Sequence, residues 1–100
     1  MKRKVITKKV TGGKLFRLDI DYNSRKIDNV KITGDFFMHP ENTLIHIEEV
    51  LKDISINSEE NRIVDLTNIV LKTYRTELIG FTAIDLAKAI SEVNEKWNLD

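Results

Sequence analysis

The chain has 100 residues, of which 41% are apolar and 32% are charged, and its formal net charge is zero. This composition predicts one soluble globular domain with a modest core, too small to enclose a large active site. No apolar run approaches the roughly 18 residues of a membrane span, and the first residues do not resemble a signal peptide, so we expect a cytoplasmic protein. The sequence has no cysteine, which excludes disulfides, thiolate metal ligands and cysteine nucleophiles.

The first third of the chain has the pattern of three antiparallel strands. Phe16 to Tyr22 alternates apolar and charged residues, as in a strand with one dry face and one wet face. Two adjacent glycines before it predict a hairpin turn back to a strand over residues 5–10. A polar run after it predicts the next turn, into a strand over residues 27–33. The sequence therefore predicts a β-meander within residues 1–37.

Three helices are expected in residues 40–100. The first begins at Pro40, since the missing N–H of proline suits a first turn. The second follows an acidic start at residues 57–60, and the third follows a capping box at residues 82–85, with residues 78–81 as an apolar connector. The expected buried faces are Leu44, Ile47, Leu51 and Ile54; then Ile63, Leu66, Val70 and Tyr74; then Leu86, Ala89 or Ile90, Val93 and Trp97.

These elements predict an α+β fold in which three helices pack on one face of a three-stranded antiparallel sheet. No linker, repeat or low-complexity segment interrupts the sequence. We therefore expect residues 1–100 to form a single domain.

The segment Gly34-Asp35-Phe36-Phe37 follows the third strand and presents two aromatic residues in succession. Successive strand residues point to opposite faces, so both rings cannot enter one core unless the backbone bends, which Gly34 permits. We expect one ring in the core and the other at a partner interface. Asp35 is expected to fix the turn by accepting nearby backbone N–H groups, rather than to act as a general base.

Other candidate sites receive less support from their spacing. Gly12, Gly13 and Lys14 lack the pattern of a phosphate-binding loop and are expected to form a hairpin turn, from which Lys14 can still project toward a nucleotide held by another subunit. His39 and His46 are seven residues apart, which does not suit two ligands on one helical face, so no metal site is expected.

Charge is unevenly distributed along the chain. Residues 1–34 contain ten Lys or Arg and three acidic residues, whereas residues 35–100 contain six and thirteen. A basic first half suits nucleic acid, phosphates or an acidic protein, although lysines also protect the edges of sheets. Phe16 and Tyr22 fall on the apolar face, so a base-stacking platform is poorly supported and a nucleic-acid-binding module is the weakest alternative.

Four blocks of the sequence resemble, in order, the small accessory domain of lipoate-protein ligases. They are residues 13–17, residues 27–32, the Gly34 to Phe37 step and residues 48–51, which together span the first half of the chain. Asp53 stands where this family has glycine.

The resemblance implies a separate small subunit that completes a two-polypeptide lipoate-protein ligase as a heterodimer with a catalytic subunit. In such enzymes lipoate and ATP give lipoyl-adenylate and pyrophosphate, and the lipoyl group then passes to a lysine of a lipoyl domain or of the glycine-cleavage H protein. Lipoate, ATP and Mg are expected to bind to the complex and none to this chain alone. The catalytic residues lie in the large subunit, so none is assigned here.

The resemblance also implies roles for particular residues. The Gly34 to Phe37 step is expected at the interface with the catalytic subunit, and Lys14 or Arg17 near the phosphate end of the nucleotide. An alternative function is a cysteine-free adaptor, because the accessory domain resembles the fold of sulfur-acceptor and iron–sulfur scaffold proteins. Such an adaptor would bind a protein partner without affecting a ligase.

Overall fold

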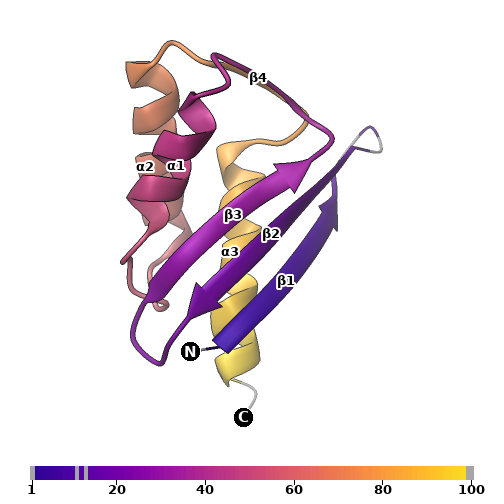
Figure 1. Ribbon diagram of the computed structural model, residues 1–100. Helices are drawn as coiled ribbons and strands as arrows, with labels where there is room; N and C mark the ends of the chain where they lie inside the picture. Colours follow the sequence, from indigo (N-terminus) through magenta and orange to yellow (C-terminus); the bar gives the residue numbers. More distant parts are fainter. Residues whose placement is uncertain (1, 11, 13, 99–100) are drawn as a thin grey trace.

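The computed structural model describes residues 2–10, 12 and 14–98, with side chains described as far as residue 93. Its elements in chain order are β1 (Lys2–Lys9), β2 (Leu15–Tyr22), β3 (Ile27–Gly34), β4 (Phe37–His39), α1 (Thr43–Leu51), α2 (Glu60–Thr73), β5 (Glu77–Ile79) and α3 (Ala83–Asn98). They form a three-stranded sheet, a two-stranded ribbon and three helices (Figure 1). The predicted α+β class is confirmed. Within the described residues, no helix is long and apolar enough to cross a membrane.

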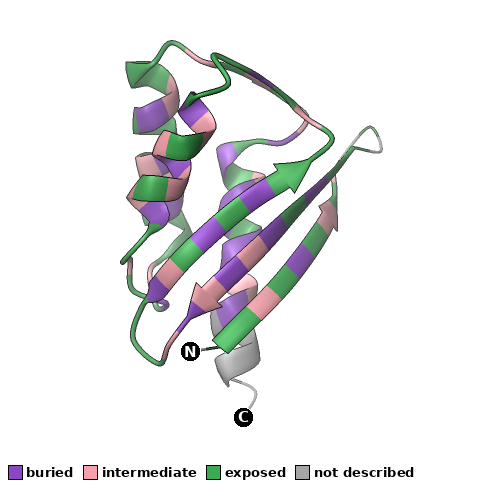
Figure 2. Cartoon of the chain, viewed as in Figure 1, coloured by how far each residue is buried: buried purple, intermediate pink, exposed green. Residues whose placement is uncertain are grey.

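Strands β1, β2 and β3 form the predicted antiparallel meander, with β2 in the centre. Ile6, Leu18 and Ile32 are partners in its register, and all three are buried because they point to the same face. Figure 2 shows this alternation as purple bands along β2 and β3. Strand β1 begins at Lys2, earlier than the predicted start at Val5.

Helix α3 lies across the buried face of the sheet, α1 packs beside β3, and α2 packs against α1 and α3 (Figure 1). Its N-terminus is the predicted capping box: the Thr82 N–H donates to Asp85 Oδ2 at 2.9 Å, and the Asp85 N–H donates to Thr82 Oγ1 at 3.2 Å. Ala89 and Ile90, which the sequence left as alternatives, are both buried. The side chain of Trp97, predicted for the same face, lies outside the described residues.

Helix α1 is shorter than predicted at both ends. It begins at Thr43 rather than Pro40, and the Pro40 carbonyl accepts the Thr43 N–H at 3.2 Å. It ends at Leu51, because Lys52 is already extended, with a ψ of 137°, and Asp53 follows with a φ of 70° in the left-handed region that favours glycine. This conformation would suit glycine, the residue that the resemblance leads us to expect at this position. Ile54, predicted on the face of the helix, lies beyond its end.

Helix α2 follows the predicted acidic segment, but its buried face differs from the predicted one. Ile63 and Val70 are buried as expected. Tyr74 is 42% exposed and lies at the C-cap, outside the helix. Thr67 is fully buried instead, a polar residue that apolar periodicity does not identify.

The prediction that residues 78–81 form an irregular connector is wrong, because residues 78 and 79 belong to strand β5, which pairs antiparallel with β4. The partners in register are Phe37 with Ile79, Met38 with Leu78, and His39 with Glu77. Strands of 3 residues are too short for a period-two pattern to appear in the sequence. The ribbon is fixed to the start of α1, where the buried Thr43 hydroxyl lies 2.6 Å from the Thr76 hydroxyl.

The helical half closes the outer edge of β3. The Ile32 N–H donates to Glu48 Oε2 of α1 at 2.8 Å. The Ile27 N–H donates to the Ile54 carbonyl at 2.9 Å, and the Asp53 N–H donates to the Ile27 carbonyl at 2.7 Å. These bonds satisfy backbone groups that an edge strand would otherwise leave unpaired.

Replacing Glu48 by alanine is expected to lower the free energy of unfolding by about 1–3 kcal/mol, because the Ile32 N–H loses a charged acceptor. The matched control is Glu49→Ala, an exposed neighbour in the same helix, which should change stability by less than about 0.5 kcal/mol. Urea unfolding of both variants measures the difference. Equal losses would show that the bond to β3 does not contribute.

Candidate partner-binding surface

The β4–β5 ribbon presents an apolar pair to solvent. Phe37 and Ile79 lie opposite each other and are 51% and 56% exposed. The next pair in the ribbon, Met38 and Leu78, points the other way, toward the core, and Met38 is buried. The His39 ring stacks on Phe37 with centroids 6.5 Å apart. The outward face of the ribbon therefore exposes aliphatic and aromatic groups that a partner protein can contact.

Phe36 faces the opposite way and joins the core. Its ring meets Phe81 edge-on at 5.0 Å, and Phe81 stacks on Phe16 at 4.9 Å. Phe81 and Phe16 are buried, while Phe36 is half-buried. The predicted separation of the two rings is thus observed, and the contact of Phe37 with a partner stays a prediction.

Two glycines allow the ribbon to approach the rest of the molecule. At Gly34, with φ +145°, an added Cβ would lie 2.5 Å from the Leu15 carbonyl oxygen. At Gly80, with φ +123°, it would lie 2.8 Å from Phe36 Cβ. Sequence reasoning found Gly34 but missed Gly80, Phe81 and the exposed Ile79. The available signal was a second glycine close to phenylalanine, which repeats the Gly34 to Phe37 arrangement.

Asp35 fixes its turn through the backbone and not, as predicted, through its carboxylate. The Asp35 N–H donates to the Leu15 carbonyl at 2.7 Å. The carboxylate is 73% exposed and lies 3.8 Å from Lys14 Nζ, whose side chain is 51% exposed. The structure therefore brings Lys14 and Asp35 together in a loose pair at the base of the ribbon, which contributes little to stability.

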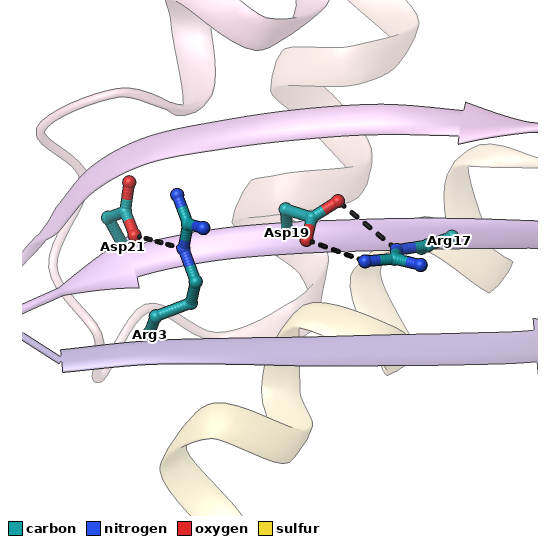
Figure 3. Close-up of polar contacts among 4 residues, drawn as sticks. All are labelled: Arg3, Arg17, Asp19 and Asp21. Carbon is teal, nitrogen blue, oxygen red and sulfur yellow. Dashed lines mark hydrogen bonds and ion pairs between the residues drawn. The ribbon is translucent and has the colours of Figure 1, made fainter.

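Arg17 lies elsewhere, on the solvent-exposed face of the sheet. Its guanidinium donates to both oxygens of Asp19 at 3.3 Å, next to the Arg3–Asp21 pair at 2.9 Å (Figure 3). The hydrogen bond and the charge of Asp21 raise the pKa of Arg3 above its usual value. Lys14 precedes β2 and lies beside Asp35, whereas Arg17 lies within β2 and pairs with Asp19, so the structure does not bring them together.

Two open hollows flank the ribbon. The larger, about 560 Å³, is lined by Val10, Gly12, Lys14, Leu78, Ile79, Gly80, Phe81, Thr82 and Asp85. The smaller, about 280 Å³, is lined by Phe36, Phe37, Met38, Glu41 and Leu44. Mostly apolar linings with one or two charged groups at the rim suit side chains of a protein partner.

The two histidines make ring contacts. His39 stacks on Phe37, and His46 stacks on Tyr74 with centroids 4.2 Å apart. In the part of the chain that the structure describes, no cluster of three or more His, Cys, Asp or Glu side chains is placed to hold a metal ion.

The Gly80→Ala variant is expected to be less stable than Gly12→Ala by about 1–3 kcal/mol. Both glycines have positive φ, but a Cβ at Gly12 would meet nothing within 4 Å, whereas one at Gly80 would collide with Phe36. Gly12→Ala should therefore cost only the backbone strain, about 1–2 kcal/mol. Urea unfolding of both variants tests this, and equal stability would show that the ribbon can move away from Phe36 at no cost.

The chain is similar in sequence to a subunit of a known ligase. Over 54 residues it is 35% identical to lipoate-protein ligase A subunit 2 of Thermoplasma acidophilum, a match that covers 54% of this chain and 57% of that protein. The match therefore spans little more than half the length of this curated relative. No protein-family model matches the chain.

The fold gives a longer match. It is similar to a chain in the solved structure of an archaeal lipoylation system from Thermoplasma acidophilum, a bi-partite lipoate protein ligase and its E2 lipoyl domain. The TM-score is 0.73 at 25% identity, covering 89% of this chain and 94% of that chain. The resemblance to the accessory part of lipoate-protein ligases, in its separate-subunit form, is therefore confirmed in sequence and in fold.

Proposed function

We propose that this chain is the accessory subunit of a two-part lipoate-protein ligase and forms a heterodimer with the catalytic subunit. The observation that carries this proposal is the similarity of most of the chain, at a TM-score of 0.73, to a chain of a bi-partite lipoate protein ligase. The match to a ligase subunit 2 supports the same role. The alternative of an adaptor related to sulfur-acceptor proteins has no comparable match in its favour.

The reaction proposed for the complex has two steps. A carboxylate oxygen of lipoate attacks the α-phosphorus of Mg-bound ATP, which forms lipoyl-adenylate and releases pyrophosphate. The amine of an acceptor lysine, on a lipoyl domain or the glycine-cleavage H protein, then takes the lipoyl group and releases AMP. The hollows of this chain are open to solvent, so the pockets for lipoate and nucleotide are assigned to the catalytic subunit.

The contribution of this chain is to the first step. Binding of a rigid accessory domain over the catalytic site would exclude water and hold the reacting carboxylate and phosphate in line. The ribbon is the proposed contact: Gly34 and Asp35 set its turn, Phe36 anchors it to the core, and Phe37 with Ile79 meets the partner.

Either Lys14 or Arg17 is the proposed residue near the phosphate end of the nucleotide. Lys14 is the better placed, because its loose pair with the exposed Asp35 can be exchanged for a phosphate at little cost. Arg17 would first have to leave Asp19, to which it donates two hydrogen bonds. A Lys14→Ala variant that assembles normally but slows adenylation would support this placement.

The test of the function is lipoate-dependent release of pyrophosphate from ATP by the catalytic subunit of the same organism, with and without this chain. Strong stimulation that saturates near one chain per catalytic subunit is expected. The control is transfer from preformed lipoyl-adenylate to an acceptor domain, which shows that the catalytic subunit is competent. A competent subunit that is not stimulated would overturn the proposal in favour of the adaptor.

The double variant Phe37→Ala/Ile79→Ala is expected to weaken binding to the catalytic subunit by about 2–4 kcal/mol, because exposed apolar pairs of this kind form the centres of interfaces. Isothermal titration calorimetry measures the affinity. The free energy of unfolding of this variant should change little, since both side chains are more than half exposed.

The matched control for this variant is Ile69→Ala. Ile69 is 61% exposed on α2, outside the ribbon, and its removal should leave the affinity unchanged. If the ribbon variant and the control variant change the affinity equally, the ribbon is not part of the interface.

A further inference from the structure

The two outer edges of the three-stranded sheet differ. The edge of β3 is closed by the helical half, where Glu48 accepts the Ile32 N–H at 2.8 Å. Strand β1 forms the other edge, and no described helix or strand lies outside it in Figure 1. The sheet therefore has one open edge, along β1.

The hairpin shows which backbone groups of β1 point outward. The Val10 N–H donates to the Lys14 carbonyl at 2.8 Å, and this pair continues the register of β1 and β2. Hydrogen-bonded pairs alternate along an antiparallel ladder, so even-numbered residues of β1 bond to β2 and odd-numbered residues direct their N–H and C=O groups outward. Within the described residues these outward groups have no hydrogen-bond partner; they belong to Arg3, Val5, Thr7 and Lys9.

Strand β1 is a long and regular edge strand. It has 8 residues, more than the usual length of about 5–6, and it contains no proline. Its register with β2 has no bulge. Its protection against pairing is therefore charge, supplied by Lys2, Arg3, Lys4, Lys8 and Lys9 with no acidic residue between them.

This charge disfavours a second copy of the chain as the partner of β1. Two β1 strands that pair antiparallel, with their apolar faces on the same side, place odd-numbered residues opposite odd-numbered ones. In the two registers with the greatest overlap, Lys8 lies opposite Lys2 or Lys4. Like charges directly opposite are destabilising, whereas an acidic strand would gain from the same lysines.

We propose that the open edge of β1 binds an extended, acidic segment of the catalytic subunit as a fourth strand of the sheet. Unpaired N–H and C=O groups along a strand are matched by the backbone of another strand. Carboxylates of the segment would lie beside Lys4 on one face and Lys9 on the other, and neither lysine has an ion pair within the described residues. This inference rests on the proposed function and goes beyond it, because it names the backbone conformation and the charge of the partner segment.

The open edge adjoins the ribbon proposed to contact the same partner. Val10 follows β1 directly and lines the same hollow as Ile79 of the ribbon. An added strand would lie beside β1, so the Arg3–Asp21 pair on the open face of the sheet would stay in place. One partner can therefore contact the ribbon and extend the sheet.

Hydrogen exchange of the complex with the catalytic subunit, followed by NMR, tests the pairing residue by residue. The amide protons of Val5, Thr7 and Lys9 should exchange fast in the free chain and at least about tenfold more slowly in the complex. Those of Ile6 and Lys8, which bond to β2, should be protected in both states. Unchanged exchange at Val5 and Thr7 would overturn the inference, and so would protection in the free chain that rises with its concentration, since a second copy would then hold the edge.

The Thr7→Pro variant tests the same pairing by removing one outward N–H. Edge strands tolerate proline where the N–H faces solvent, so the ladder with β2 should persist. Calorimetry should show at least about tenfold weaker binding to the catalytic subunit, whereas the control Thr7→Ala should bind like the wild type. Equal affinities of the two variants would overturn the inference. If the proline variant does not fold, the exchange measurement on the wild-type chain decides.

The charge of the segment is tested separately. Lys9→Glu should weaken binding about three- to tenfold, because the added strand would meet a like charge. Lys52→Glu, the same change at the exposed C-cap of α1, should leave the affinity unchanged. Equal affinities of these variants would reject an acidic occupant.

The results distinguish failure of this inference from failure of the proposed function. A wild-type chain that does not bind the catalytic subunit would reject the function and the inference with it. A chain that binds and stimulates the catalytic subunit, with no protection gained at Val5 and Thr7, would reject the inference alone.

Discussion

Close approach of the ribbon to the sheet, possible only at two glycines, is the constraint on which the rest of the structure depends. Gly34 brings the end of β3 against the backbone of β2, and Gly80 brings β5 against Phe36. These approaches allow Phe36, Phe81 and Phe16 to contact one another in succession from the ribbon into the core, the first two edge-on and the last two stacked. A side chain at either glycine would collide with its neighbour and push the layers apart, which would weaken these ring contacts, so local backbone freedom contributes to the packing of the aromatic core.

The consequence is a ribbon that exposes one face to solvent and is held to the core through the other. Its two strands have 3 residues each, too few to be stable alone. Met38 and Phe36 anchor it from below, and the buried Thr43 hydroxyl bonds to Thr76 at its far end. A surface held in this way loses little conformational entropy when a partner binds, which favours affinity from a small number of exposed groups.

The sequence predicted the meander, the three helices and the opposite directions of the two phenylalanines, because strand alternation, helical spacing and the capping box are local signals. It did not predict β5, since 3 residues carry no period and the pairing with β4 joins distant segments. It placed Asp35 in the right turn but assigned the bond to the carboxylate instead of the N–H, a choice that depends on where the Leu15 carbonyl lies. Thr67 was missed because burial of a hydroxyl is decided by tertiary packing. Lys14 and Arg17 were offered as alternatives near the nucleotide because of their charge, although Lys14 lies at the base of the ribbon and Arg17 on the open face of the sheet.

Charge distribution explains why the ribbon side, and not the open sheet, is the better docking surface. The open face of the sheet is rich in charge, but Arg3 and Arg17 each donate to an aspartate on that same face (Figure 3). A partner there would have to break these pairs or cover them without gaining an opposite charge. The Phe37–Ile79 pair of the ribbon presents no such competition, because both of these exposed side chains are apolar. Two of the ten basic residues in the first segment, Arg3 and Arg17, are thus neutralised within the sheet, whereas the ribbon exposes an apolar pair that needs no partner of opposite charge.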